Sequence, residues 1–203
     1  MPPLSPLTRT VRAALLWLYR RQRWHVSAEA PLPPRCVIIG APHTSNWDFL
    51  VFLGATDALG IRPAFMGKHS LFKFPMGGFM REMGGVAVNR ASSRNYVEQM
   101  AEAFASRAEL QLVIAPEGTR KGAERWKTGF YHIACAAGVP IVPAWLNYQT
   151  REVCMTRPIQ PTGDFAADMA KIAAVYLAHG QGRYPEKTRT DFAAMLAEAR
   201  RAA

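Results

Sequence analysis

Short apolar runs alternate with helical patterns from residue 35 to the end of the chain. The clearest run, LQLVIA at 110–115, is rich in β-formers, which is typical of a buried strand. The alternation of such runs with helical segments predicts an α/β fold: a single domain whose mixed, largely parallel sheet is flanked by helices. The expected strands cover 36–40, 62–66, 86–88, 110–115, 139–145 and 152–159, and the expected helices cover 47–59, about 93–107, 129–137, 165–178 and 190–201.

The longest stretch without a charged residue runs from Thr128 to Thr150, which could cover the roughly 20 residues that a membrane span needs. It contains Gly138, Pro140 and Pro143, so we expect a short helix followed by a buried strand, and no transmembrane helix. Because proline cannot donate to a central ladder, the two prolines predict that this strand lies at a sheet edge.

The first 28 residues form a basic amphipathic segment, separated from the rest by a proline-rich stretch at 31–34. Ser5 can cap a helix with Pro6 in its first turn, and no acidic residue precedes Glu29. Segment 1–28 either docks on the main domain, 35–203, with a solvated basic face, or lies on an anionic membrane surface as an anchor. The expected apolar stripe consists of Leu7, Val11, Ala14, Leu15 and Leu18, and Leu16 interrupts the pattern.

Charge narrows the choice of partners. The 203-residue chain has 25 lysines and arginines against 15 acidic residues, a formal net charge of +10. This excess favours an anionic partner: nucleic acid, an anionic bilayer surface or a phosphorylated substrate. The basic residues are scattered and no nucleic-acid-binding signature appears, so no nucleic acid is expected. The three widely spaced cysteines indicate a reducing compartment, and we expect no metal site.

A histidine and an aspartate follow the first strand expected after residue 35. His43 comes just beyond 36–40, and Asp48 lies in the first turn of the helix expected at 47–59. On one continuous helix, a spacing of five would turn the two side chains about 140° apart, so they meet only if a turn separates them. The small polar residues at 44–46 supply that turn and the expected helix cap. The pair is therefore either a general base with its orienting carboxylate, or a capping turn with an incidental histidine.

Three further segments stand at strand ends or form short strands. PEGTR at 116–120 follows LQLVIA directly and places a carboxylate, a turn-permitting glycine and a forked donor together. The glycine-led run GGVAVNR at 84–90 ends in Arg90, and VPIVP at 139–143 is the last segment. A solvated turn would account for one of the charges in PEGTR but not for the whole arrangement.

In this order and spacing, the four segments resemble the glycerolipid acyltransferase family, which includes 1-acylglycerol-3-phosphate acyltransferases. The resemblance covers about residues 35–145. It implies that His43 and Asp48 are catalytic. The positions that it assigns to substrate binding are Arg90, Glu117, Gly118, Thr119 and Arg120.

The resemblance also implies a reaction. A fatty acyl chain would move from acyl-CoA or acyl carrier protein, as co-substrate and with no other cofactor, to the hydroxyl of a lysophospholipid, above all 1-acylglycerol-3-phosphate. The enzyme would act in phospholipid biosynthesis as a peripheral protein at the cytoplasmic face of a membrane. The alternatives are transfer to another lysolipid acceptor, or a noncatalytic membrane or lipid-binding protein with the same fold. Lys121 and Asn89 depart from the family's usual residue types, which bears on the acceptor.

The residues themselves favour direct transfer. No serine stands in a Gly-x-Ser-x-Gly elbow, and no cysteine has a recognisable base partner. We expect His43 to remove the acceptor's proton while Asp48 holds the imidazole tautomer. Arg90 and Arg120 would clamp the acceptor phosphate, and Glu117 would orient one of them or the glycerol hydroxyls. A helical spacing links Met76, Met80 and Met83, which are either core or the lining of an acyl groove.

Overall fold

Seven strands form one sheet in the computed structural model, which describes residues 4–88 and 93–202. The strand order is β1-β7-β6-β2-β5-β3-β4, and all neighbours are parallel except β6 and β7. The predicted α/β fold with a mixed, largely parallel sheet is therefore confirmed. The strands are β1 (His25–Ala28), β2 (Arg35–Ala41), β3 (Ala64–Lys68), β4 (Gly85–Val88), β5 (Leu110–Ile114), β6 (Ile141–Asn147) and β7 (Glu152–Met155).

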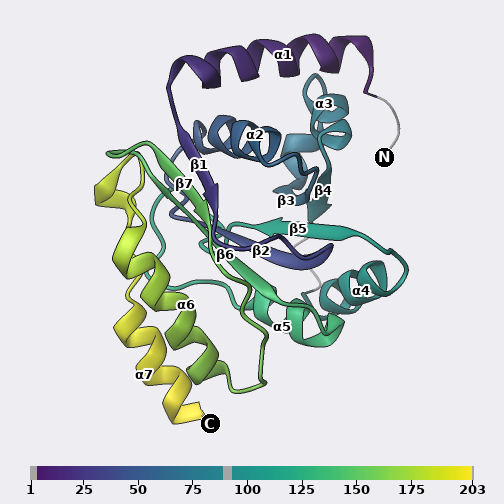
Figure 1. Ribbon diagram of the computed structural model, residues 1–203. Helices are drawn as coiled ribbons and strands as arrows, with labels where there is room; N and C mark the ends of the chain where they lie inside the picture. Colours follow the sequence, from purple (N-terminus) through teal and green to yellow (C-terminus); the bar gives the residue numbers. More distant parts are fainter. Residues whose placement is uncertain (1–3, 89–92, 203) are drawn as a thin grey trace.

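Helices cover the sheet on both sides (Figure 1). One layer contains α1, α2 and α3, and the other contains α4 to α7. No helix in the described ranges is both long and apolar enough to cross a membrane. The bounds are α1 (Pro6–Arg21), α2 (Asp48–Ala58), α3 (Gly77–Glu82), α4 (Ser93–Ala105), α5 (Gly129–Ala137), α6 (Phe165–His179) and α7 (Phe192–Ala202), with short 3-10 helices η1 (His69–Phe72) and η2 (Pro185–Lys187).

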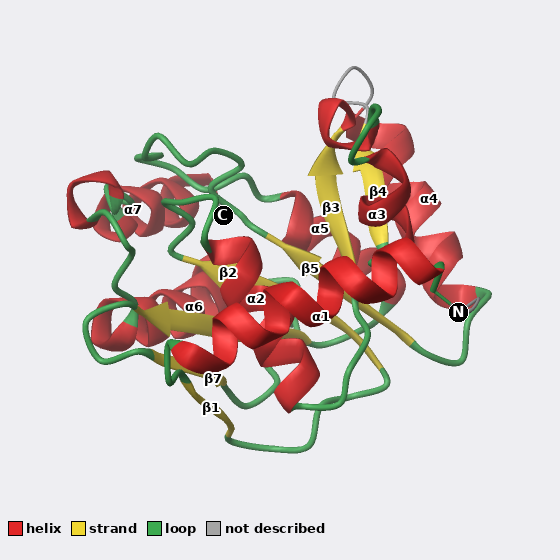
Figure 2. Cartoon of the chain, turned by 90° about the horizontal axis from the view of Figure 1, so that it is seen from above, coloured by secondary structure: helices red, strands yellow, loops and turns green. Residues whose placement is uncertain are grey.

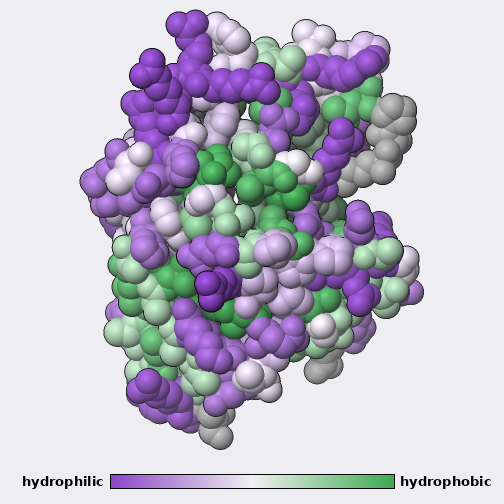
Figure 3. All heavy atoms as spheres, viewed as in Figure 1, coloured by the Kyte–Doolittle hydropathy of each residue, from purple (hydrophilic) through white to green (hydrophobic). Residues whose placement is uncertain are grey.

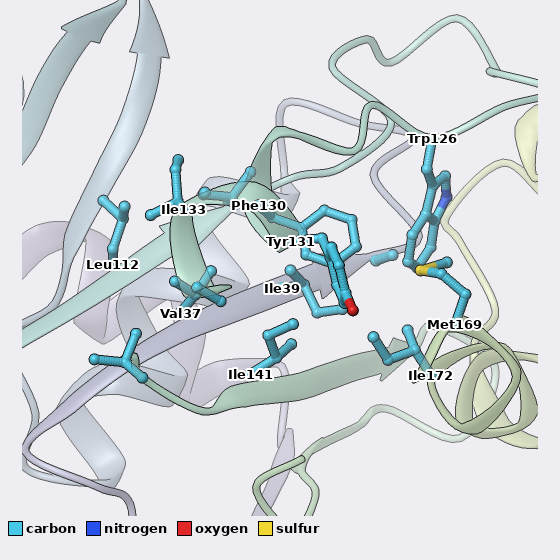
Figure 4. Packing of buried hydrophobic residues seen from close by; sticks show 14 of the residues in the cluster. Val37, Ile39, Leu112, Trp126, Phe130, Tyr131, Ile133, Ile141, Met169 and Ile172 are labelled. Atoms are coloured by element: carbon cyan, nitrogen blue, oxygen red, sulfur yellow. The ribbon is translucent and has the colours of Figure 1, made fainter. Parts of the chain in front are cut away.

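Strand β2 shows why the sheet needs helices on both faces. Its side chains alternate between the faces. Val37 and Ile39 belong to the largest apolar cluster, with side chains from α5 and α6, as Figure 4 shows. Cys36 and Ile38 belong to a cluster that also contains Leu59, which caps the C-terminal end of α2. A strand that is buried on both faces is apolar throughout, which is how the run CVIIG reads in the sequence.

The structure corrects the expectation that the strand at 139–145 is an edge strand. It forms β6, which lies between β2 and β7 in the interior of the sheet. Pro140 precedes β6, and the carbonyl of Pro143 accepts the N–H of Thr156 on the β7 side, so the nitrogen of Pro143 also faces away from β2. The β7 ladder covers Ala144 to Asn147 only, so Pro143 lies where that ladder ends. The next strand, expected at 152–159, is shorter and ends at Met155.

The N-terminal segment is a helix only in part. The Ser5 hydroxyl accepts the Thr8 N–H as the predicted cap, but the helix ends at Arg21 and residues 25–28 form β1. The expectation of one helical segment over 1–28 is therefore wrong in its extent. Because β1 pairs with β7, its four residues belong to the sheet.

The expected apolar stripe of α1 is confirmed only in part: Leu15 and Leu18 pack against a buried cluster, but Leu7 and Ala14 are exposed. Leu16, which interrupts the expected stripe, is buried. The inner face of α1 packs on α2 (Figure 2), and Arg12 and Arg20 bind Asp57 of α2 at 2.6 and 3.3 Å. Hydrophilic residues dominate the outer side of α1 at the top of Figure 3. One face of the helix is therefore docked on the domain.

Candidate active site

Three segments with candidate functional residues leave the sheet at neighbouring positions. Strand β2 lies between β5 and β6 and is parallel to both, so all three strands end at the same edge. His43 follows β2, Glu117 follows β5, and Tyr148 follows β6 directly.

His43 and Asp48 are in contact, as the sequence predicts. Nδ1 of His43 lies 3.0 Å from Oδ2 of Asp48, across the turn at 42–47. The N–H groups of Thr44 and Ser45 each donate to the same carboxylate oxygen at 2.9 Å. Asp48 lies in the first turn of α2, but the N-cap residue is Trp47, without a side-chain cap bond, rather than one of residues 44–46. The aspartate thus fixes both the turn and the imidazole.

A tyrosine that the sequence analysis missed binds the other oxygen of the aspartate. The hydroxyl of Tyr148 donates to Oδ1 of Asp48 at 2.8 Å. Burial, followed by the charge of Asp48, raises the pKa of Tyr148 well above its ordinary value, so the hydroxyl keeps its proton. The Trp24 ring packs edge-on against the Tyr148 ring, with 5.0 Å between centroids. The position of Tyr148 at the end of β6 is the one signal that could have identified it.

Glu117 lies behind the histidine. Its side chain is only 4% exposed, and Oε1 accepts the backbone N–H of His43 at 2.8 Å. No described residue hydrogen-bonds Oε2, which is buried. Burial raises the pKa of Glu117 to about 7; the charge of Asp48 adds to this effect, and the bond from His43 opposes it. The carboxyl group therefore supports the position of His43 by a direct contact that the sequence could not predict.

The rest of the PEGTR block forms a tight turn beyond β5. Gly118 has φ +63°, a left-handed conformation that a glycine adopts without strain, and a Cβ there would lie 3.1 Å from the Lys127 side chain. The Thr119 hydroxyl accepts the N–H of Lys121 at 3.2 Å, and Arg120 is exposed. Arg120 has no ion-pair partner within the part of the chain that the structure describes.

Arg90 lies outside the described residues, so its predicted role stays a prediction. Strand β4, which precedes it, is the outermost strand beside β3.

A segment after α6 covers the turn at 42–47. The N–H of Tyr184 donates to the Thr44 hydroxyl at 3.3 Å, and a Cβ on Gly182 would come within 2.6 Å of the Thr44 side chain. The Arg183 guanidinium lies 5.5 Å from the centroid of Trp47 and 5.7 Å from that of Tyr148. Beside this contact is a cavity of about 390 Å³, lined by Gln22, Trp24, Trp47, Tyr148, Arg151 and Arg183.

The arrangement has the chemistry of a general base. With a proton on Nδ1 held by Asp48, the imidazole keeps a lone pair on Nε2, and no hydrogen bond to Nε2 occurs among the described residues. The His43 side chain remains about a quarter exposed, at 26%, while Asp48 is buried. A hydroxyl that reaches His43 from solvent or from a lipid can therefore give up its proton there.

The chain is similar in sequence to a known protein family over the segment that contains these residues. The Acyltransferase family model matches residues 23–147, which contain His43, Asp48 and the PEGTR block. The chain is 30% identical over 124 residues to the 1-acyl-sn-glycerol-3-phosphate acyltransferase of Salmonella typhimurium, covering 58% of this chain and 49% of that protein. It is 32% identical over 130 residues to the enzyme of the same name from Haemophilus influenzae, covering 61% and 52%.

The fold has a solved counterpart. The crystal structure of the 1-acyl-sn-glycerophosphate (LPA) acyltransferase from Thermotoga maritima matches with a TM-score of 0.52 at 19% identity, over 85% of this chain and 78% of that chain. The chain spans about half the length of the curated relatives that it matches. The family model itself covers more than half of the chain. This chain therefore belongs to the acyltransferase family.

Proposed function

We propose that this protein transfers a fatty acyl group from a thioester donor to the hydroxyl of 1-acylglycerol-3-phosphate. The observation that supports this most is the imidazole of His43, oriented by Asp48 and left with an open Nε2 at the sheet edge. The names of the curated relatives support the choice of acceptor. Either acyl-CoA or acyl carrier protein would supply the acyl chain as co-substrate.

The reaction needs one base and no covalent intermediate. Nε2 of His43 removes the proton of the acceptor hydroxyl while the oxygen attacks the thioester carbonyl. The tetrahedral intermediate collapses as the carbon–sulfur bond breaks, and the thiolate takes the proton from the imidazolium. Asp48 stabilises that cation and keeps the tautomer, and Tyr148 and Glu117 hold Asp48 and the His43 backbone in place.

The acceptor's phosphate requires cations nearby. We assign this role to Arg120, which is exposed on the turn after β5, together with Arg90, as planar donors to phosphate oxygens. Gly118 and Thr119 shape the turn that carries Arg120. A reaction on a lysophospholipid would take place at a membrane, and we propose peripheral attachment at its cytoplasmic face.

The test is a product analysis with the purified chain. Isotope-labelled acyl-CoA and acyl carrier protein are each incubated with a panel of lysolipids that includes 1-acylglycerol-3-phosphate, and the products are identified by mass spectrometry. Labelled phosphatidate is the expected product. Labelled product from a different lysolipid alone would overturn the assigned acceptor. No transfer from either donor to any acceptor would overturn the enzymatic function and favour a noncatalytic lipid-binding protein.

A further inference from the structure

The segment that follows β3 exposes apolar side chains to solvent. Phe74 is 98% exposed, Met76 50% and Leu71 36%, which is unusual for large apolar residues grouped within six positions. We call residues 71–76, which run from the end of η1 to the residue before α3, the β3–α3 tip. Phe72 is its one buried residue.

The surroundings of the tip are cationic. Lys68 ends β3, Lys73 lies in the tip and Arg81 lies in α3, and no acidic residue occurs between Lys68 and Glu82. All three cations are exposed, and none has an ion-pair partner among the described residues. The carboxylate of Glu82 accepts the N–H and the hydroxyl of Ser5, each at 2.9 Å. A surface that combines protruding apolar groups with unpaired cations is complementary to an anionic lipid surface.

The tip lies at the edge of the sheet that carries His43. Strand β3 is parallel to β5 and next to it, so β3 ends at the edge where Glu117 follows β5. Phe72 packs in an apolar cluster with Phe65 and Met80. Phe49 packs against the same cluster and directly follows Asp48, with 5.7 Å between the ring centroids of Phe49 and Phe65. Side chains at the base of the tip are thus continuous with the first turn of α2.

We propose that the β3–α3 tip inserts Leu71, Phe74 and Met76 into the headgroup region of an anionic bilayer. The inference rests on the proposed function, because a lysophospholipid and a fatty acyl chain both reside in the membrane that the tip would enter. The tip protrudes with its apolar side chains and offers cations beside them, which favours a lipid surface over a second copy of this equally basic chain. Insertion would hold the edge with His43 against the lipid surface.

Vesicle binding of the full chain tests the proposal. Sedimentation with phosphatidylcholine vesicles that contain phosphatidylglycerol is measured for the wild type and for the variant Leu71→Ser/Phe74→Ser/Met76→Ser. We expect the variant's partition coefficient to fall by at least about tenfold, or about 1.4 kcal/mol. Phe74→Trp should retain binding, and Lys73→Gln should weaken binding only when phosphatidylglycerol is present. Leu177→Ser, at a leucine of α6 that is 72% exposed, is the matched control and should bind normally.

A second variant separates the tip from α1, which also exposes apolar residues. Leu7→Ser/Trp17→Ser removes the two large exposed apolar side chains of α1. Loss of binding in this variant together with normal binding of the tip variant would overturn the proposal. Equal binding of the wild type and the tip variant, or no binding by the wild type, would also overturn it. Concentration-dependent dimerisation that the tip variant abolishes, without vesicle binding, would assign the tip to a second copy instead.

Failure of the proposed function would look different, because sedimentation requires no turnover. If acyl transfer is absent but the tip variant loses vesicle binding, the result supports membrane binding by the tip and contradicts the proposed reaction. If transfer occurs, the tip variant should keep its rate with a dissolved short-chain acceptor and lose at least about tenfold with an acceptor embedded in vesicles. An unchanged rate on vesicles would contradict the docking role. An unchanged melting temperature shows that the variant is folded.

Discussion

The segments after β2 and β3 leave the same edge of one sheet but differ in construction. In the turn at 42–47, the N–H groups of His43, Thr44 and Ser45 all donate to the buried carboxylates of Glu117 or Asp48. In the β3–α3 tip, every residue except Phe72 is exposed. Buried carboxylates bind the backbone of the first segment, whereas the second segment exposes its apolar side chains to solvent.

The difference shows how burial relates to the two tasks that we propose. A general base must be held in one tautomer and one position, so its turn is tied to buried acceptors. A membrane contact needs groups that the protein core does not use, and exposed apolar side chains are such groups. Substitution of a buried carboxylate that holds the turn should therefore change stability, and for Asp48 turnover as well, whereas substitutions in the tip should change neither in water.

The largest effect is expected for Asp48→Asn. Oδ2 accepts from three groups, and a neutral amide oxygen in its place would bind them more weakly and would not stabilise an imidazolium. Turnover should fall by roughly 10²–10⁴-fold, and the free energy of unfolding should fall by about 2–4 kcal/mol. Steady-state kinetics and urea unfolding measure the two quantities. Near-normal turnover would show that the carboxylate does not orient a base.

Glu117→Gln should change how stability depends on pH. The pKa of Glu117 is raised from 4.5 to about 7 in the folded protein, so the native state keeps this proton while the unfolded state loses it. The contribution of the protonated group is therefore complete below about pH 4.5 and is lost as the pH rises to about 7. Relative to the glutamine variant, the free energy of unfolding of the wild type should fall by up to roughly 3 kcal/mol over this pH range. Parallel curves of unfolding free energy against pH would contradict the buried, uncompensated carboxyl group.

Tyr148→Phe removes one hydroxyl from the site. Asp48 then keeps its three bonds at Oδ2 but loses the one at Oδ1. Turnover should fall by about tenfold, on the scale of one hydrogen bond to a charged group, while the KM of the acceptor stays the same, because Tyr148 acts through Asp48. Tyr184→Phe, at an exposed tyrosine, is the control. A raised KM with normal turnover would place Tyr148 in substrate binding instead.

The smallest effect is expected for Phe74→Ser in water. The side chain is almost fully exposed and loses no contact of consequence in the folded protein, so the free energy of unfolding should change by less than about 0.5 kcal/mol. Turnover of dissolved short-chain substrates should stay the same. Marked destabilisation in a thermal scan would show that the tip packs against the protein and would remove the contrast with the turn at 42–47.

The pattern of apolar runs was sufficient to predict most of the fold. A run such as LQLVIA is apolar because both faces of a parallel sheet are covered, and that property is local to the sequence. The position of β6 was not predictable. A proline disrupts a sheet only where a neighbouring strand pairs with the side that its nitrogen faces, and the β7 ladder ends beside Pro143. The inner face of α1 depends likewise on where α2 lies, so Leu16 rather than Leu7 is buried.

The sequence was sufficient to predict those contacts of the candidate site that join residues close together in the chain. His43 and Asp48 are five residues apart, and a short turn suffices to bring them together. Tyr148 reaches Asp48 across 100 residues of sequence, and Glu117 reaches the His43 backbone across 74. Such contacts arise from the order of strands in the sheet, which a single sequence does not contain. The buried state of Glu117, and therefore its raised pKa, follows from the same packing.

Replacement of His43 tests whether its imidazole is the general base for acyl transfer. The rate of acyl transfer to 1-acylglycerol-3-phosphate is measured for the wild type, for His43→Ala and for His132→Ala, an exposed histidine on α5. If His43 is the general base, His43→Ala lowers turnover by at least about 10²-fold, and its free energy of unfolding stays close to that of the wild type. His132→Ala should be normal in both. Turnover that survives in a folded His43→Ala protein would show that His43 is not the general base.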